Sequence, residues 1–349
     1  MQGANHFNTR KLFLTFTLLV VSFFLNNTAF SDASQGIPGQ KVDQLQAVVN
    51  QAYNKYKDLK EGKNADYIPI LATVPSDLFG VVIITREGKI YSAGDVDYAF
   101  SIQSVSKPFN AALVMQEQGA QAIPEKIGVE PTGLPFNSKM ALELYPARSV
   151  NPLVNAGAIA SVSMVEAKDE KERWNKVLGN LSGFAGEDLK LMKEVYTSEY
   201  ETSWSNRAIA NLLYNYGRLY SDPEEALIVY TKMCSVGITA RQLGMMGATL
   251  ANDGVNPKTG KRMLDKESVP KLLSVMLTAG FYDESGIWSY TAGLPAKTGV
   301  GGGIVAVAPG KMAIVAFSPR LNEAGNSIRA MKAINDISNE LKLNIFASK

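Results

Sequence analysis

The segment Ser104-Val105-Ser106-Lys107 places a hydroxyl and an amine three positions apart. Positions i and i+3 share one face of a helix, so a helix starting here brings the Ser104 hydroxyl toward the Lys107 amine. Lysine can replace histidine as the base that activates a serine, provided that burial or a nearby cation lowers its pKa far below about 10.4. The spacing therefore indicates acyl transfer, although a helix-capping serine followed by a solvent-facing lysine gives the same pattern.

A second motif, Lys297-Thr298-Gly299, opens a predicted strand late in the chain and is followed by Val300-Gly301-Gly302-Gly303. Glycines beside a strand let the backbone approach a ligand closely, and an N–H there can stabilise an oxyanion. Lys297 also offers a second cation that can lower the pKa of Lys107. An early S-x-x-K and a late K-T-G are two of the three motifs of the serine β-lactamases and penicillin-binding proteins. The third motif, S-D-N, is missing.

The rare residues exclude much other chemistry. The chain has one cysteine, Cys234, and one histidine, His6, among 349 residues. Internal disulfides, cysteine-cluster metal sites, His-ligated zinc and a Ser-His-Asp triad in the body of the chain are therefore ruled out. With 46% apolar and 19% charged residues, the composition is that of an enzyme-sized globular protein. Its near-neutral charge of +2 gives no nucleic-acid footprint.

The N-terminus has the layout of an export signal. Arg10 and Lys11 precede an uncharged apolar run from Leu12 to Leu25, and Ala29-Phe30-Ser31 offers a small-x-small cleavage site. We therefore expect a signal peptide over residues 1–31, a single domain over residues 32–349, a periplasmic or secreted protein, and no stable membrane insertion after cleavage. The run is short for a bilayer span of about 20 residues, and an uncleaved anchor is the alternative. If the signal interpretation is wrong, the protein is cytoplasmic.

The elements that must position these groups follow from periodicity. Residues 41–57 form an amphipathic helix, and residues 79–93 form a β-hairpin around Gly88. Residues 104–278 are mostly helical, and strands return near the C-terminus before a last amphipathic helix. Strands at both chain ends with helices between them predict an α+β fold, in which one antiparallel sheet carries an inserted helical lobe. The remaining expected elements are helices over 206–216, 223–234, 240–250, 266–277 and 328–341, and strands over 303–308 and 311–317.

From about Tyr67 to Phe317 the chain resembles the serine-dependent glutaminases, which share the β-lactamase-like fold. The matching segments come in order and span most of the chain. They are Tyr67-Ile68-Pro69, residues 100–107 (FSIQSVSK), residues 151–159 (NPLVNAGAI), Tyr196-Thr197-Ser198-Glu199 with Asn206, Tyr230 before Cys234-Ser235, residues 247–257 (GATLANDGVNP), residues 281–286 (FYDESG) and residues 293–300 (GLPAKTGV).

This resemblance implies hydrolysis of L-glutamine to L-glutamate and ammonia without a metal or organic cofactor. It implies that Ser104 attacks the side-chain amide, that Lys107 takes the serine proton, and that Tyr282 relays protons to the leaving ammonia and from water. The backbone N–H groups of Ser104 and Val300 then form the oxyanion hole. Family members commonly form homo-oligomers, and we expect one here.

The same resemblance implies a pocket for the amino-acid end of the substrate. Glutamine presents an ammonium and a carboxylate, so its site needs an anion and hydrogen-bond donors. Glu199 is the expected partner of the ammonium, and neutral side chains fix the carboxylate and amide. Gln103 lies beside the nucleophile without an assigned role. The neutral candidates are Tyr67, Asn155, Asn206 and Tyr230.

Two other interpretations fit part of the sequence. A penicillin-recognising serine hydrolase of the cell envelope accounts for Ser104, Lys107, Lys297 and the export signal. It does not account for the segments around Asn155 and Glu199. A non-catalytic ligand sensor on the same fold is the second alternative.

Overall fold

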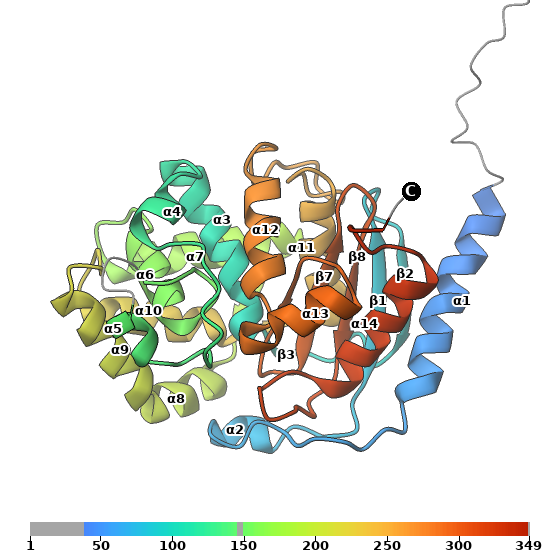
Figure 1. Cartoon of the computed structure of the whole chain (residues 1–349), viewed down its shortest axis with the longest axis horizontal. Coiled ribbons are helices and arrows are strands. Elements are labelled where there is room, and N and C mark those ends of the chain that lie inside the picture. The colour runs from blue at the N-terminus through green and yellow to red at the C-terminus, as the bar shows by residue number, and fades with distance from the viewer. Residues whose placement is uncertain (1–37, 145–148, 348–349) are drawn as a thin grey trace, which may run out of the picture.

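The computed structural model describes residues 38–144 and 149–347 (Figure 1). The predicted signal peptide, residues 1–31, lies outside these ranges. Within them, no helix combines the length and apolar character needed to cross a membrane.

A five-stranded antiparallel sheet forms one side of the molecule, with strand order β2-β1-β8-β7-β6. Its centre joins the two ends of the chain, because β1 pairs with β8 and places Ile83 opposite Ile314. The predicted hairpin is β1 with β2, and the prediction of one sheet built from distant parts of the chain is confirmed. The strands are β1 (Gly80–Thr85), β2 (Ile90–Gly94), β6 (Ala296–Thr298), β7 (Gly303–Ala308) and β8 (Met312–Phe317).

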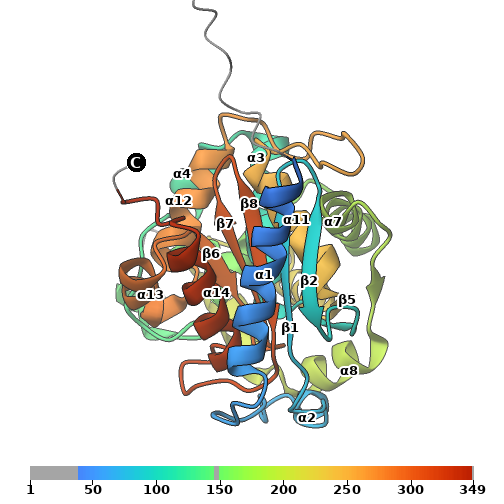
Figure 2. The ribbon, with the colours of Figure 1, turned by 90° about the vertical axis from the view of Figure 1, so that its right-hand side faces the viewer.

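Both faces of this sheet are covered by helices. Val82 and Ile84 of β1 face a core shared with α11 (Ala240–Ala251), whereas Val81 and Ile83 face a second core. The second core lies under α1 (Pro38–Tyr56) and α14 (Ile328–Glu340), which run side by side across the sheet (Figure 2). Burial on both faces explains why the central strands are continuous apolar runs in the sequence instead of alternating ones.

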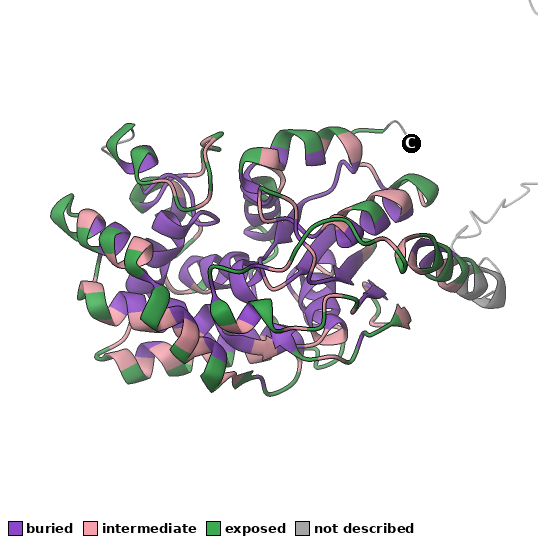
Figure 3. Ribbon diagram, turned by 90° about the horizontal axis from the view of Figure 1, so that it is seen from below, coloured by how far each residue is buried: buried purple, intermediate pink, exposed green. Residues whose placement is uncertain are grey.

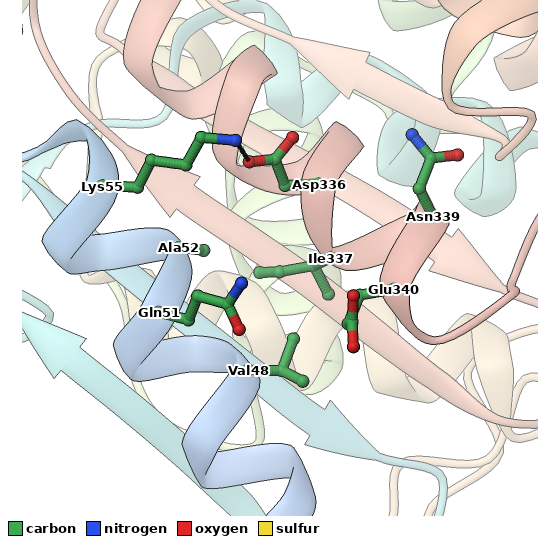
Figure 4. Close-up of a pocket in the computed structure, with 8 residues that line it drawn as sticks. All are labelled: Val48, Gln51, Ala52, Lys55, Asp336, Ile337, Asn339 and Glu340. Carbon is green, nitrogen blue, oxygen red and sulfur yellow. Dashed lines mark hydrogen bonds and ion pairs between the residues drawn. The ribbon is translucent and has the colours of Figure 1, made fainter.

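Helix α11 approaches the sheet closely because glycines face the strands. A Cβ at Gly247 would lie 2.7 Å from side-chain atoms of both Ala313 and Val305. On the opposite face, the groove between α1 and α14 contains Ala52 and Ile337 and ends at an ion pair of 2.6 Å between Lys55 and Asp336 (Figure 4). No predicted site residue lines this groove.

The inserted helical lobe lies beside the sheet (Figure 1). Helix α6 runs through its interior and is buried along its whole length, as its almost wholly small and apolar sequence requires. The apolar core that contains Val82 continues into this lobe through Phe109 and Ile159. Figure 3 shows buried ribbon in both the sheet and the lobe. The helices of the lobe are α3 (Lys107–Gln118), α4 (Ala122–Lys126), α5 (Met140–Leu144), α6 (Asn155–Met164), α7 (Glu170–Ala185), α8 (Lys193–Thr202), α9 (Trp204–Asn215) and α10 (Pro223–Cys234).

Short elements connect the two lobes. A three-stranded sheet of order β3-β5-β4 lies where they meet, and the α12–α13 region returns the chain to the large sheet. The predicted helix over 266–277 begins later, at Val269, where Pro270 occupies the first turn. These elements are α2 (Pro69–Ala72), β3 (Phe100–Ser101), the 3₁₀ helix η1 (Gln103–Ser106), β4 (Lys190–Leu191), β5 (Val236–Ile238), α12 (Val269–Ala279), the 3₁₀ helix η2 (Tyr282–Glu284) and α13 (Ser285–Thr291).

Candidate active site

The segment that carries Ser104 lies between the two lobes. The chain leaves β3, and the N–H of Ile102 donates to the Val236 carbonyl at 2.8 Å. Gln103 then adopts a left-handed φ of +49° and starts η1. A 3₁₀ turn aligns positions i and i+3, so Ser104 and Lys107 lie on one side of the segment. The predicted helix start is therefore a 3₁₀ turn that leads into α3 at Lys107, with Pro108 in the first turn of α3.

The Lys107 amine is directed into the protein and away from solvent. Its side chain is fully buried, and its Nζ donates to Oδ1 of Asn155 at 2.6 Å. The ring centres of Tyr230 and Tyr282 each lie 5.8 Å from this nitrogen. Burial lowers the pKa of Lys107 to about 8, against the opposing effects of Cys234 and Glu199. No hydrogen bond joins the amine to the Ser104 hydroxyl within the described ranges.

Tyr282 is the aromatic neighbour of the nucleophile. It is buried and has a left-handed φ of +57°, a conformation that a non-glycine residue adopts only when its surroundings impose it. Burial raises the pKa of its hydroxyl, and the nearby Ser104 hydroxyl opposes that rise. In the part of the chain that the structure describes, the Tyr282 hydroxyl makes no well-formed hydrogen bond. It is therefore a neutral group whose hydroxyl remains available to a ligand.

Lys297 packs against the ring of Tyr282. Its Nζ lies 3.9 Å from the centre of the Tyr282 ring and donates to the carbonyls of Gly280 and Thr298 at 3.0 and 2.7 Å. Burial first, and then the charge of Lys107, hold the pKa of Lys297 well below its ordinary value. Burial of Lys107 is what lowers the pKa of that amine, and Lys297 does not contribute to the shift. This corrects the expectation from the K-T-G motif.

The glycine-rich turn after β6 lies against the nucleophile. A Cβ on Gly299 would sit 3.2 Å from the backbone nitrogen of Ser104, and one on Gly301 would overlap the Ser101 carbonyl. The motif closes the short strand β6 and leads into this turn, so it does not open β7 as predicted. Only glycines allow so close an approach, which brings the start of this turn, at Gly299, beside the Ser104 backbone.

On the helical side, Gln103 connects the nucleophile segment to Glu199. Its Nε2 donates to Oε2 of Glu199 at 2.9 Å. Glu199 comes from α8 and is buried, so it is not the solvated helix charge that its sequence position also allowed. Burial raises the pKa of Glu199 to about 7, and Gln103 and Lys107 oppose the rise. Gln103 had no assigned role in the sequence analysis, and the structure shows that its side chain binds Glu199.

Two asparagines continue from Lys107. Asn155 stands at the start of α6, and its Nδ2 donates to Oδ1 of Asn206 on α9 at 2.8 Å. Tyr230 of α10 is buried, and burial raises the pKa of its hydroxyl well above the ordinary value. Beside it, burial raises the pKa of the Cys234 thiol to about 12. The helical side therefore contributes mainly neutral hydrogen-bonding groups around one carboxyl.

Tyr67 lies at the rim of the site, just before α2. Its side chain is 53% exposed, yet burial of the hydroxyl end raises its pKa, with Tyr282 and Glu199 contributing. The predicted residues on both lobes are thus brought together.

The sequence analysis missed Phe136, whose ring centre lies 5.0 Å from that of Tyr282 and whose carbonyl accepts the N–H of Asn155 at 2.9 Å. No motif distinguishes this phenylalanine from an ordinary core residue.

None of the described residues forms a group of three or more histidine, cysteine, aspartate and glutamate side chains suited to hold a metal ion. The ionisable groups of the site are two buried amines, one buried carboxyl, buried phenols and a buried thiol. Such a set suits proton transfer and hydrogen bonding.

A buried serine–lysine pair between an antiparallel sheet and a helical lobe is the arrangement typical of the β-lactamase-like fold. The family model described as Glutaminase matches residues 62–346. The chain is 52% identical over 302 residues to a glutaminase of Colwellia psychrerythraea, covering 86% of this chain and 97% of that protein. It is 54% identical over 288 residues to a glutaminase of Brucella canis, covering 82% of this chain and 91% of that protein.

Solved structures give the same result. A probable glutaminase named ybaS superposes with a TM-score of 0.86 at 49% identity, covering 88% of this chain and 99% of that one. Mglu, solved in a glutamate form, superposes with a TM-score of 0.83 at 35% identity, covering 87% of this chain and 70% of that one. The chain belongs to the glutaminase family, so the family predicted from the sequence motifs is confirmed.

Proposed function

We propose that this protein hydrolyses the side-chain amide of L-glutamine to L-glutamate and ammonia through a covalent Ser104 acyl-enzyme. The observation that carries the proposal is the buried Lys107 amine, whose pKa of about 8 leaves a useful neutral fraction near neutral pH. Family membership supports the same reaction. The comparisons name glutaminases and give no support to a penicillin-recognising hydrolase or a non-catalytic sensor.

In the acylation step, neutral Lys107 accepts the Ser104 proton while the serine oxygen bonds to the amide carbon. The carbonyl oxygen becomes an oxyanion, and the N–H groups of Ser104 and Val300 stabilise it. Such donors contribute about 3–4 kcal/mol each to the transition state. The close contact of Gly299 with the Ser104 backbone supports this pairing of the two N–H groups.

In the following steps the C–N bond breaks, and the nitrogen takes up the proton, relayed by Tyr282, and leaves as ammonia. Water then attacks the ester carbonyl, gives up a proton by the same route, and releases L-glutamate as Ser104 recovers its hydrogen. Tyr282 suits this relay because its hydroxyl is buried next to Ser104 without a committed partner among the described residues.

Substrate binding uses the helical side. The ionised Glu199 pairs with the α-ammonium of glutamine, and Gln103 holds that carboxylate in place through its hydrogen bond. Asn155, Asn206, Tyr230 and Tyr67 supply hydrogen bonds to the α-carboxylate and the amide. A charged substrate group restores the charged form of Glu199, which burial disfavours in the empty site.

The decisive test uses one purified sample with three compounds: L-glutamine, L-asparagine and a β-lactam. We expect ammonia from L-glutamine and none from the Ser104→Ala variant. The Ser106→Ala variant is the matched control, because the Ser106 hydroxyl donates to the Gln103 carbonyl and has no place in the reaction. Opening of the β-lactam ring without ammonia release would favour the penicillin-recognising alternative, and saturable binding without turnover would favour the sensor.

We also propose that residues 1–31 are an export signal and that the mature protein acts in the periplasm or outside the cell. The basic residues, apolar run and small-x-small site of the N-terminus support this. Mass spectrometry of the first residue of the protein from the periplasmic and culture fractions tests it. Detection of the intact N-terminus in the cytoplasm alone would contradict it.

A homo-oligomer is the expected assembly, on the strength of the family resemblance. Light scattering on the purified protein after size-exclusion chromatography measures its molar mass. A mass equal to one chain at all concentrations would contradict this proposal.

A further inference from the structure

Residues 318–327 connect β8 to α14, and the loop of residues 320–327 within this connection passes next to the active site. We propose that Glu284 is a positioning residue. Its carboxylate holds this loop in place, and the loop in turn keeps Val300 and Tyr282 in position. The inference rests on the proposed function, since it assigns a further residue to the same reaction.

Glu284 and two asparagines form one closed hydrogen-bonded unit. The carboxylate accepts from Nδ2 of Asn322 at 3.0 and 2.9 Å through its two oxygens, and also from Nδ2 of Asn326. Within the loop, the N–H of Asn326 donates to Oδ1 of Asn322 at 2.9 Å, and the N–H of Asn322 donates to the Asn326 carbonyl at 2.9 Å. Asn326 is fully buried, so its amide has no solvent to replace the carboxylate.

The loop held in this way contacts the oxyanion side of the site. Gly325 has a left-handed φ of +86°, and a Cβ built there would lie 3.4 Å from Cγ1 of Val300 and 3.7 Å from Cε1 of Phe136. Phe136 in turn packs against the Tyr282 ring and accepts the N–H of Asn155. A displacement of the loop would therefore shift Val300 directly and Tyr282 through Phe136.

The same loop also holds the segment that leads to Tyr67. Leu321 and Lys63 exchange backbone hydrogen bonds of 2.8 and 3.1 Å. The Leu321 side chain shares a small apolar cluster with Ile68 and Val300. Glu284 itself belongs to η2, which begins at Tyr282. Its carboxylate therefore connects one loop with Tyr282, with the turn that contains Val300 and with the segment that leads to Tyr67.

The chemistry of the carboxylate makes the proposal testable by an isosteric change. An ionised carboxylate only accepts hydrogen bonds, and here it faces three N–H contacts from two amides. Glu284→Gln keeps the size of the side chain but presents an NH₂ group to amide donors, which removes at least one contact. Displacement of reacting groups by a fraction of an ångström to one ångström lowers kcat on the order of 10- to 100-fold.

The experiment compares Glu284→Gln, Asn322→Ala and the double variant with wild type. Glu323→Gln is the matched control, because Glu323 lies exposed in the same loop and the charge change is the same. We expect kcat to fall about 10- to 100-fold with KM changed less than about threefold in each single variant, and the double variant to match the single ones because both break one unit. Glu323→Gln should behave as wild type.

Hydrogen exchange of residues 320–327 provides a readout that does not depend on activity. Faster exchange there in Glu284→Gln, with unchanged exchange in the central sheet, supports the proposal. Unchanged exchange, activity equal to that of Glu323→Gln, or additive losses in the double variant would overturn it. If the wild-type chain releases no ammonia from glutamine, the proposed function fails, whereas hydrogen exchange still decides whether Glu284 holds the loop.

Discussion

The two sides of the active site are built in different ways. On the sheet side, Tyr282 and Val300 are fixed by the backbone: a left-handed residue in one case and a glycine-rich turn in the other. On the helical side, Asn155, Glu199 and Tyr230 project from three separate helices and contact the Gln103–Lys107 segment through their side chains. In the proposed mechanism, backbone conformation thus places the groups that stabilise the transition state, and side-chain hydrogen bonds place the groups that recognise the substrate.

Ser104 and Lys107 lie at the boundary and share features of both sides. The 3₁₀ turn carries Ser104 and leads into α3 at Lys107, whose amine reaches Asn155 of the helical lobe. In the proposed mechanism, the proton acceptor is therefore in contact with the substrate pocket. This arrangement predicts that changes on the helical side alter the base as well as binding.

The largest expected effect on kcat comes from Lys107, at the boundary between the two sides. Lys107→Met should lower kcat on the order of 10²- to 10⁴-fold, because it removes the buried amine that is the proposed base for Ser104. Lys107→Arg is the informative companion, since it retains a cation but cannot give up its proton near neutral pH. Pre-steady-state acylation assays measure both. Substantial activity in the arginine variant would mean that Lys107 acts as a charge and that the base lies elsewhere.

A smaller and different effect is expected from the helical side. Glu199→Gln should raise the KM for glutamine about 10- to 100-fold, because the substrate ammonium loses a charged hydrogen-bond partner. The effect on kcat should be smaller, since the reacting atoms lie on the other side. Glu201→Gln is the matched control, as Glu201 lies exposed on the same helix. A KM equal to that of the control would remove Glu199 from the substrate pocket.

The difference between the two sides also explains what could be predicted from the sequence. The sheet side is encoded by local signals: apolar runs for β1, β7 and β8, and glycines after Lys297. Even there, sequence placed the K-T-G motif at the start of a strand, because short strands such as β6 carry little periodicity. The S-x-x-K spacing indicated Ser104 and Lys107 as a candidate pair but not the conformation of Gln103 or the burial of Lys107.

The helical side depends on contacts between distant residues, which no local pattern specifies. Gln103 meets Glu199, and Lys107 meets Asn155, only because α10 packs against α6, α8 and the nucleophile turn η1. These residues were predicted through the family resemblance, and their neighbour Phe136 was missed altogether. A buried glutamate and an exposed one look alike in a helical segment, and tertiary packing decides between them.

The smallest expected effect, a shift in pH dependence, tests whether the two sides are coupled. Lys107 must be neutral to act as base, and Glu199 must be ionised to bind ammonium, so both requirements favour higher pH. The value of kcat/KM should therefore rise with pH through about 7 and about 8, steeply below the first and less steeply between them. The value of kcat should report Lys107 alone, because bound ammonium keeps Glu199 ionised.

The Glu199 carboxylate stabilises the charged form of Lys107 and thereby raises its pKa. Removal of that negative charge in Glu199→Gln should lower the Lys107 pKa, so the kcat limb should move to lower pH although substrate binding is weaker. The steep lower part of the kcat/KM profile should disappear in the same variant. Complete pH profiles of wild type, Glu199→Gln and Glu201→Gln measure these shifts. A kcat limb at the same pH in all three would show that the recognition side leaves the base unaffected.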